Sequence, residues 1–340
     1  MGRSLLDLGV FMMKRLVQLV PVLIGVILIT FFFTHVGIQN PCAVWAGRHP
    51  TPAQIDNCIR TFGLDQPLPN QFLRYLWTLL SGDWGADPRG PQVLPAIAEA
   101  FPATLQLVLA SIAMIGAIGI PLGVIAAAYN GRWADHVVRI FYLSGWATPT
   151  YLGAILLAII IGPILGLPSS GEFVVANPPF PRLTHMSLVD AWLARNPPAI
   201  FDAIAHLILP ATALAFLNMG IATRMTRSSM LEVLPLDFMK TARMKGLSEF
   251  WVLFKHALRN SLISTTTVLG VTAGGLLSGT VVIEQIFQWP GIGRYAFDAV
   301  TNYNFPGAIA VVIVFACGVV VANLAADVLY GILDPRVEWR

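Results

Sequence analysis

Six long runs of apolar residues, nearly free of charge, recur along this chain of 340 residues. They occupy residues 16–36, 104–128, 138–167, 204–223, 262–286 and 308–329. A helix needs about 20 such residues to cross the hydrocarbon core of a bilayer. Lipid offers no hydrogen-bond partners, so a spanning helix must satisfy its own backbone groups. The sequence therefore predicts an all-α polytopic membrane protein with six transmembrane helices.

Composition agrees with a lipid environment. Hydrophobic residues make up 56% of the chain and charged residues 11%, and the mean hydropathy is +0.70. Soluble domains carry about 25% charged residues. The net charge of +3 gives no reason to expect a nucleic acid partner, and the six His are scattered without ligand spacing, so no metal site is expected.

The distribution of Lys and Arg predicts the orientation. Six spans put both termini on one side, and a cytoplasmic placement leaves fourteen of the 21 Lys and Arg residues inside. The positive-inside rule favours that arrangement in a cell membrane. The chain then divides into a tail with the first span (1–37), an extracellular or periplasmic segment (38–102) and a core of five further spans (103–340).

The first apolar run has an alternative interpretation as a signal peptide. Lys14 and Arg15 precede it, and Val44-Trp45-Ala46 resembles a cleavage site. The run is longer than the 7 to 15 residues of a typical signal core, which favours a retained span.

A short basic segment interrupts the apolar runs inside the loop 226–261. Asp237 is a candidate N-cap, Lys240, Arg243 and Lys245 follow it, and Gly246 suits the left-handed conformation that ends a helix. We expect a helix of about eight residues, roughly 12 Å long, then a sharp turn and a second helix from Ser248. On the cytoplasmic surface, such an element is shaped to be held by another protein.

This segment resembles the cytoplasmic loop of ATP-binding-cassette importer permeases of type I, and in particular their dipeptide, oligopeptide and nickel branch. The matching residues are Thr241-Ala242-Arg243, Lys245-Gly246-Leu247-Ser248 and His256-Ala257-Leu258-Arg259-Asn260. The acid that usually leads this pattern and the Leu-Pro that closes it are absent. The resemblance implies that an ATPase docks on Asp237, Lys240, Thr241, Ala242, Arg243, Lys245, Gly246 and Leu247.

The resemblance extends over essentially the whole chain. It includes Gly63-Leu64-Asp65-Gln66-Pro67 and Gly82-Asp83-Trp84-Gly85 before the second span, Trp289-Pro290-Gly291-Ile292-Gly293 after the fifth, and Asp334-Pro335-Arg336 at the end. The segment between the first two spans reads as ordered, with an amphipathic helix at 70–80. It is equally a simple lid or a docking surface for an extracellular binding protein.

Cys42 and Cys58 both fall in this outer segment. Two thiols on the oxidising side of a membrane can close a disulfide, and two separate buried cysteines are the alternative.

Glu284 lies close to the end of the fifth apolar run. An acid in such a place serves function or a polar partner, or it is simply solvated at the outer interface, which we expect here. The turn at Pro290, Gly291 and Gly293 is a candidate gate over a pore.

No phosphate-binding loop, nucleophile elbow or His-Glu-x-x-His motif occurs in the sequence. The chain is therefore expected to be a transport subunit, not an enzyme, with no cofactor of its own. The resemblance implies a second permease chain, two ATPase subunits that bind ATP and Mg²⁺, and an extracellular binding protein.

Two rival functions remain at this point, a membrane-embedded enzyme that uses Glu284 and Asp327 as acids and a passive channel. Peptides are the cargo that the resemblance favours, with nickel, opines and oligosaccharides as alternatives.

Overall fold

The computed structural model describes residues 5–36, 42–43, 50–86, 92–173, 180–302 and 304–333. Within these residues the regular structure is helical, apart from one isolated bridge between Ala86 and Gln92. The chain forms two compact units: Met1–Thr104 with Pro290–Val320, and Leu105–Trp289 with Val321–Arg340. The three-part division at 37 and 102 stays a prediction.

The first unit holds two short helices that precede the second apolar run. Its elements are α1 (Leu5–Phe31), α3 (Pro52–Phe62), α4 (Leu68–Leu80), the start of α5 (Val93–Met114), α15 (Ile292–Thr301) and the start of α16 (Phe305–Leu333). The sequence did not predict α3, although Thr51 and Gln54 form a reciprocal capping box at its start and Gly63 closes it at φ 66°.

The helix expected at 70–80 is α4, and it begins two residues earlier, where Leu68-Pro69 suits a first turn. Its buried side meets the end of α1, where the rings of Phe31 and Phe72 meet edge to face at 5.3 Å. A cavity of about 490 Å³ in this unit is lined by residues that include His35, Tyr75 and Trp84.

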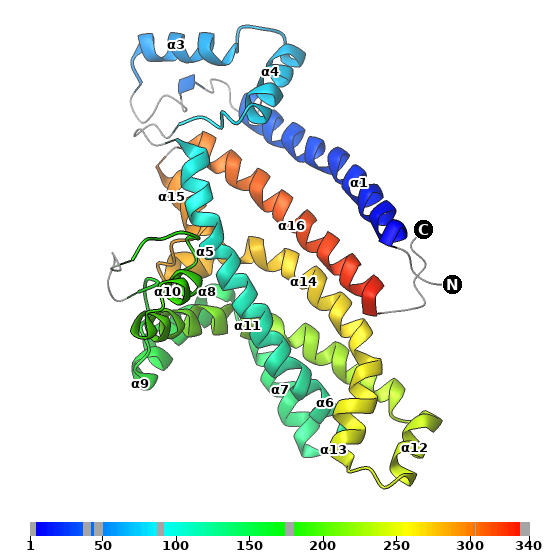
Figure 1. Ribbon diagram of the computed structural model, residues 1–340. Coiled ribbons are helices and arrows are strands. Elements are labelled where there is room, and N and C mark those ends of the chain that lie inside the picture. The colour runs from blue at the N-terminus through cyan, green and yellow to red at the C-terminus, as the bar shows by residue number, and fades with distance from the viewer. Residues whose placement is uncertain are drawn as a thin grey trace. The chain divides into compact units, whose positions relative to one another are not determined.

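The second unit is built around the longest helix. Its elements are the end of α5, α6 (Ile120–Ala128), α7 (Trp133–Ala147), α8 (Thr150–Leu156), α9 (Gly162–Leu165), α10 (Ser187–Leu193), α11 (Pro197–Val233), α12 (Asp237–Met244), α13 (Glu249–Trp251), α14 (Leu258–Ile286) and the end of α16. α11 packs against α6, α7 and α14 (Figure 1).

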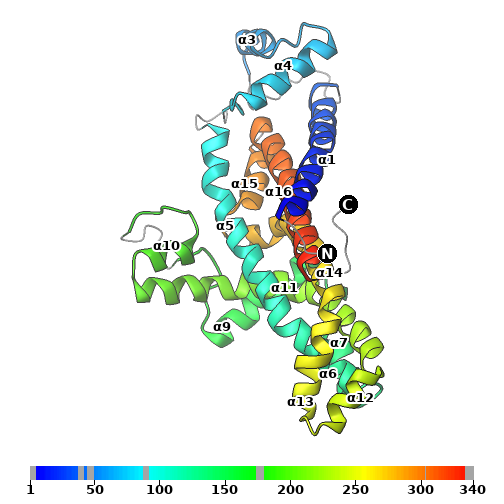
Figure 2. The ribbon, with the colours of Figure 1, turned by 45° about the vertical axis from the view of Figure 1, so that its right-hand side comes forward.

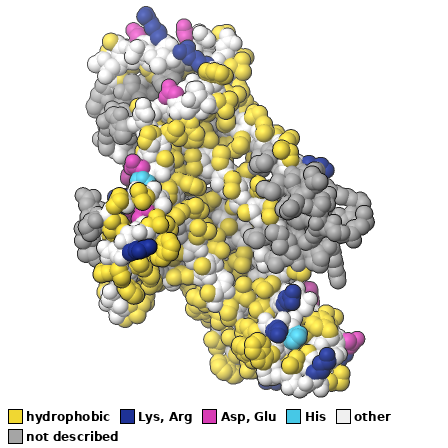
Figure 3. Space-filling model, in the orientation of Figure 1, with side chains coloured by type: hydrophobic (Ala, Val, Ile, Leu, Met, Phe, Trp, Pro, Cys, Tyr) yellow, Lys and Arg dark blue, Asp and Glu magenta, His cyan; other side chains and the backbone are white. Residues whose placement is uncertain are grey.

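Four helical stretches of the described residues are long and apolar enough to cross a membrane: Val93–Ala128, Pro197–Val233, Val268–Ile286 and Pro306–Ala326. A fifth is the pair Trp133–Ala147 and Thr150–Leu165, if this pair, bent by 109°, counts as one span. Apolar side chains cover much of the face in Figure 3. The described residues thus form the helices of a multi-pass membrane protein.

Proline accounts for the sharpest bend. Pro149 stands between α7 and α8, and a proline disfavours helical geometry in the residue before it. Pro121 instead sits in the first turn of α6, directly after a π-helical turn at Ile115–Gly119. Pro210 lies inside the continuous helix α11, so of these three prolines Pro149 marks a break between helices.

Candidate functional site

The interhelical segment, residues 234–257, connects α11 to α14 and contains the short helix α12 of eight residues. Leu236, with extended backbone (φ −67°, ψ 152°), is its N-cap, so the cap predicted at Asp237 is wrong by one residue. Asp237 is already helical, and its carboxylate accepts a hydrogen bond from Lys240 Nζ at 2.9 Å. An acid in the first turn still interacts favourably with the helix dipole.

Gly246 ends the helix with a positive φ of 76°. A Cβ atom at this position would meet no atom within 4 Å, so the turn needs glycine for its backbone conformation and not for space. The left-handed turn predicted at this glycine is therefore present. It reverses the chain between α12 and α13.

Arg243 and Glu249 join the two sides of that turn. Arg243 Nη2 donates to Glu249 Oε1 at 3.0 Å, and Nε donates to Oε2 at 3.3 Å. The hydrogen bond to Glu249 raises the pKa of the Arg243 guanidinium above its ordinary value. This two-pronged contact spans the turn, and it was not predicted from the sequence.

One face of α12 is buried. Met239 is fully buried and Ala242 nearly so, in a cluster with Val124 and Ala127 of α6, Met230 of α11, and Val252 and Ala257 of the π-helical turn before α14. Complete burial of a Met side chain contributes about 1.5 to 3 kcal/mol. α12 is thus packed onto the ends of α6 and α11 and onto the π-helical turn that leads into α14, and it lies at the same end of the second unit as α6 and α13 (Figures 1 and 2).

The other face of the interhelical segment is open. Met244 is 79% exposed, and Phe238, Leu247, Phe250 and Trp251 are exposed as well. Lys255 Nζ lies 5.7 Å from the centre of the Trp251 ring, and Lys240, Thr241 and Lys245 are exposed beside these apolar groups. Figure 3 shows Lys and Arg side chains gathered near this end of the second unit. Exposed apolar groups rimmed by charge are typical of a protein interaction surface.

Glu284 and the predicted gate belong to different compact units of the chain. Glu284, in the second unit, is fully buried, so the solvated position expected for it is wrong. Pro290, Gly291 and Gly293 belong to the first unit, where Gly291 caps α15 and the Ile292 N–H donates to Thr104 Oγ1 at 2.8 Å. Gly291 and Gly293 thus stand at the start of α15, and the gating role of the three residues stays a prediction.

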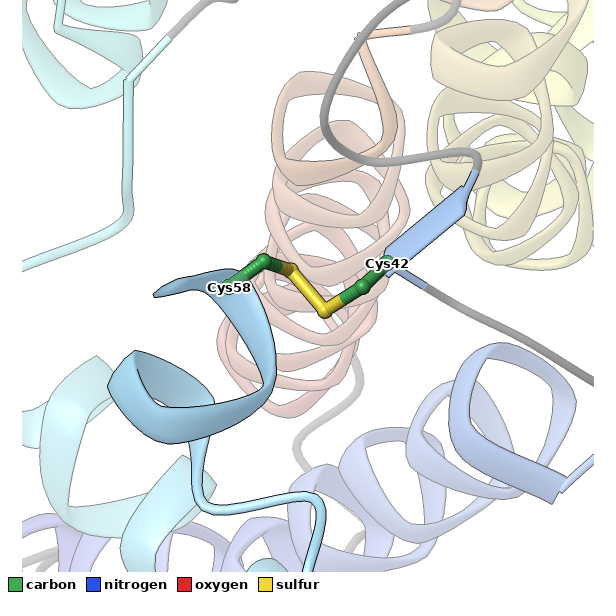
Figure 4. Close-up of a disulfide and its surroundings, with 2 residues drawn as sticks. All are labelled: Cys42 and Cys58. Atoms are coloured by element: carbon green, nitrogen blue, oxygen red, sulfur yellow. A yellow bond between two sulfur atoms is a disulfide. The ribbon is translucent and has the colours of Figure 1, made fainter. Parts of the chain in front are cut away.

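The structure joins Cys42 and Cys58 in a disulfide, with their Cα atoms 5.7 Å apart (Figure 4). The bond ties the chain that follows α1 to α3. Cys317 is free. Among the described residues, no group of three or more His, Cys, Asp or Glu is placed to hold a metal ion.

Two parts of the chain match known protein families. Residues 119–339 match the family described as the inner membrane component of binding-protein-dependent transport systems, and residues 8–113 match the N-terminal family of the same membrane component. The chain belongs to this family. The interhelical segment lies inside the first match and the disulfide inside the second.

Curated relatives of this inner membrane component match over nearly their whole length. It is 39% identical to the probable D,D-dipeptide transport system permease protein DdpB of Escherichia coli strain K12, over 95% of this chain and 96% of that one. It is 35% identical to the dipeptide permease DppB of the same strain, over 97% and 99%. It is 33% identical to the oligopeptide permease AppB of Bacillus subtilis strain 168, over 98% and 100%.

Among solved structures, the fold of this chain is similar to that of a chain in a structure of the MetNI methionine ABC transporter in inward-facing conformations. The TM-score is 0.49 at 16% identity, covering 76% of this chain and 97% of that chain.

Proposed function

We propose that this chain is one permease subunit of an ATP-driven importer for di- or oligopeptides. The cargo follows from relatives named as dipeptide and oligopeptide permeases. The partners would be a second permease chain, two ATPase subunits that bind ATP and Mg²⁺, and an extracellular binding protein. The interhelical segment would meet the ATPase on the cytoplasmic side, and both termini would lie on that side.

Six segments would cross the membrane in this importer subunit. They are α1, the pair α5 and α6, the bent group α7 to α9, α11, α14 and α16. The first unit would then carry the extracellular or periplasmic segment with α3 and α4, where the disulfide would face an oxidising compartment.

The observation that carries the proposal is the two-sided packing of α12. Met239 is buried against residues of α6 and α11, while Phe238 and Met244 are exposed. A force applied to the exposed side reaches the spans through the buried side, because close-packed side chains transmit displacement. The helix can therefore act as a lever between an ATPase and the membrane bundle.

ATP-driven closure of the two ATPases would pull on α12, and the bundle would exchange an inward for an outward opening. The hydrolysis itself belongs to the partners. In this chain, the packing of α12 and the rigid turn at Gly246 would transmit the movement, and no side chain would react.

Reconstitution in proteoliposomes tests the proposal against the rival enzyme and channel. With all partner subunits present, radiolabelled dialanine should accumulate inside only when ATP reaches the ATPase side. Uptake that is independent of ATP would support a channel. A chemical change of lipid or peptide by this chain alone would support an enzyme.

A further inference from the structure

The carboxylate of Asp135 is fully buried where α7 begins, and it faces the guanidinium of Arg227 on α11. Arg227 Nε donates to Asp135 Oδ1 at 2.8 Å, and Arg227 Nη2 donates to Oδ2 at 2.9 Å. Two parallel hydrogen bonds between an arginine and a carboxylate fix both distance and orientation. The contact joins α7 to α11 through two residues that are 92 positions apart in the sequence.

Further hydrogen bonds tie the turn between α6 and α7 into the same group. The Gly131 N–H donates to Asp135 Oδ2 at 3.0 Å, and Arg227 Nη2 also donates to Asn130 Oδ1 at 2.8 Å. Arg139, one helical turn along α7, adds a contact to Asp135 Oδ2 at 3.1 Å. Both oxygens of the buried carboxylate are thereby satisfied.

This group lies next to the cluster that holds α12. Met230 follows Arg227 by three residues, so the two share a helix face, and Met230 is buried in the cluster with Met239. Ala127, another member of that cluster, precedes Asn130 by three residues. The ion pair therefore joins α11, on which α12 rests, to α7, and the hydrogen bonds of Asn130 and Gly131 attach the end of α6 to the same group.

The Asp135 carboxylate is buried and the Arg227 side chain is 21% exposed. An ion pair so shielded from water is a poor source of stability, because desolvation of the charges offsets their attraction. Its geometry is nevertheless specific, since a small shift of α7 along α11 would break the paired hydrogen bonds. Such a pair is suited to keep two helices in one relative position while they move together.

We propose that Asp135 and Arg227 are positioning residues that make the ends of α6, α7 and α11 move as one body when α12 is displaced. This inference rests on the proposed function, because it assigns the pair to the transmission of force from the ATPase. Without the pair, α12 would move against a loosened support, and hydrolysis would continue with less transport.

The test compares Asp135→Asn, Arg227→Gln and the double variant in the complete reconstituted complex. Uptake of radiolabelled dialanine and ATP hydrolysis are measured in the same proteoliposomes. We expect the number of peptides taken up per ATP to fall at least about fivefold in each single variant. The double variant should be no worse than either single variant, because one interaction is lost in all three. Arg132→Gln, which removes an exposed charge from the same turn, should leave the ratio unchanged.

A merely structural pair gives a different result. Uptake and hydrolysis would then fall in parallel with the amount of assembled complex, and the ratio would stay at the wild-type value, which would overturn the proposal. Losses that add in the double variant would also overturn it. If the wild-type complex shows no ATP-dependent uptake, the proposed function is wrong. If the wild type shows ATP-dependent uptake and the variants take up as many peptides per ATP, only the role of the ion pair is wrong.

Arg227→Lys covers the case in which the neutral variants do not assemble. Lysine keeps the positive charge but cannot present the paired donors of arginine to the carboxylate. The proposal expects a ratio between those of the wild type and the neutral variants. A wild-type ratio in an assembled Arg227→Lys complex would contradict it.

Discussion

The guanidinium of Arg243 bridges the turn at Gly246 and contacts the carboxylate of Glu249 with two hydrogen bonds, the shorter of 3.0 Å. Arg243 belongs to α12 and Glu249 to α13, so the contact connects the two helices across the turn and limits their relative movement. Both side chains are largely exposed, and an exposed pair of this kind contributes about 1 kcal/mol or less to stability. The contact therefore matters mainly for the geometry of the turn between α12 and α13, through which force from an ATPase would pass.

Substitution of Gly246 should separate uptake from hydrolysis. Valine at φ 76° is strained, by about 1 to 3 kcal/mol for such backbone conformations, although the space around the position is free. Gly246→Val should therefore lower peptide uptake per ATP hydrolysed in proteoliposomes. Gly246→Asn is the matched control, because asparagine tolerates the left-handed region. Equal coupling in the valine variant and the wild type would count against a rigid turn.

Two glycines of the second apolar run should differ in their tolerance of alanine. A Cβ atom at Gly123 would lie 2.8 Å from the Thr223 carbonyl oxygen and 2.6 Å from Thr226 Cβ, whereas one at Gly116 meets nothing within 4 Å. Gly123→Ala should cost about 1 to 3 kcal/mol through overpacking of α6 on α11. Gly116→Ala should be neutral or slightly stabilising. Thermal unfolding in detergent measures both, and equal midpoints would refute the close approach.

Removal of the disulfide should loosen the segment that contains α3. In the chain-entropy account, a cross-link between residues 16 apart stabilises by about 3 kcal/mol. Cys42→Ser combined with Cys58→Ser should speed hydrogen exchange of α3 amides while the amides of α11 stay as protected as before. The Cys317→Ser variant, which keeps the bond, is the control. Unchanged exchange in α3 would show that the bond does not hold it.

The stability of the loop after α9 should depend on pH through Glu172. Burial raises the pKa of this carboxyl, and the charge of Arg182, which pairs with it, acts in the opposite direction. A raised pKa in the folded state means that this contribution to stability is complete below the ordinary pKa of a glutamate and is lost as pH rises through the folded-state value. The wild type should therefore lose stability relative to Glu172→Gln as the pH rises above the ordinary pKa of a glutamate, about 4.3. Parallel pH curves for the two proteins would exclude the effect.

Sequence reasoning found the features that depend on local chemistry. The apolar runs predict the long helices because lipid imposes length and hydrophobicity on a span. Asp237 and Gly246 bracket α12 to within one residue, since turn chemistry is local. The capping residues Thr51 and Gln54 carry the same kind of signal for α3, which a search for capping boxes would have found.

The missed features depend on pairs of residues distant in sequence. Asp135 and Arg227 are ordinary charged residues at the ends of two runs, and nothing local predicts that they face each other. The burial of Glu284 likewise follows from helix packing, which no hydropathy profile contains. Met239 and Ala242 stand three residues apart on one helix face, so an amphipathic interpretation of residues 237–244 could have indicated them.

The central claim is that the exposed face of the interhelical segment contacts an ATPase on the cytoplasmic side. Site-specific incorporation of a photoreactive phenylalanine at Phe250 tests it in intact membranes, with the same residue at Trp192 as an equally exposed aromatic control on α10. Irradiation should join position 250, and not position 192, to an ATPase subunit. An ATPase adduct at position 192 but not at position 250 would contradict the account, as would labelling of position 250 by a membrane-impermeant reagent from outside the cell.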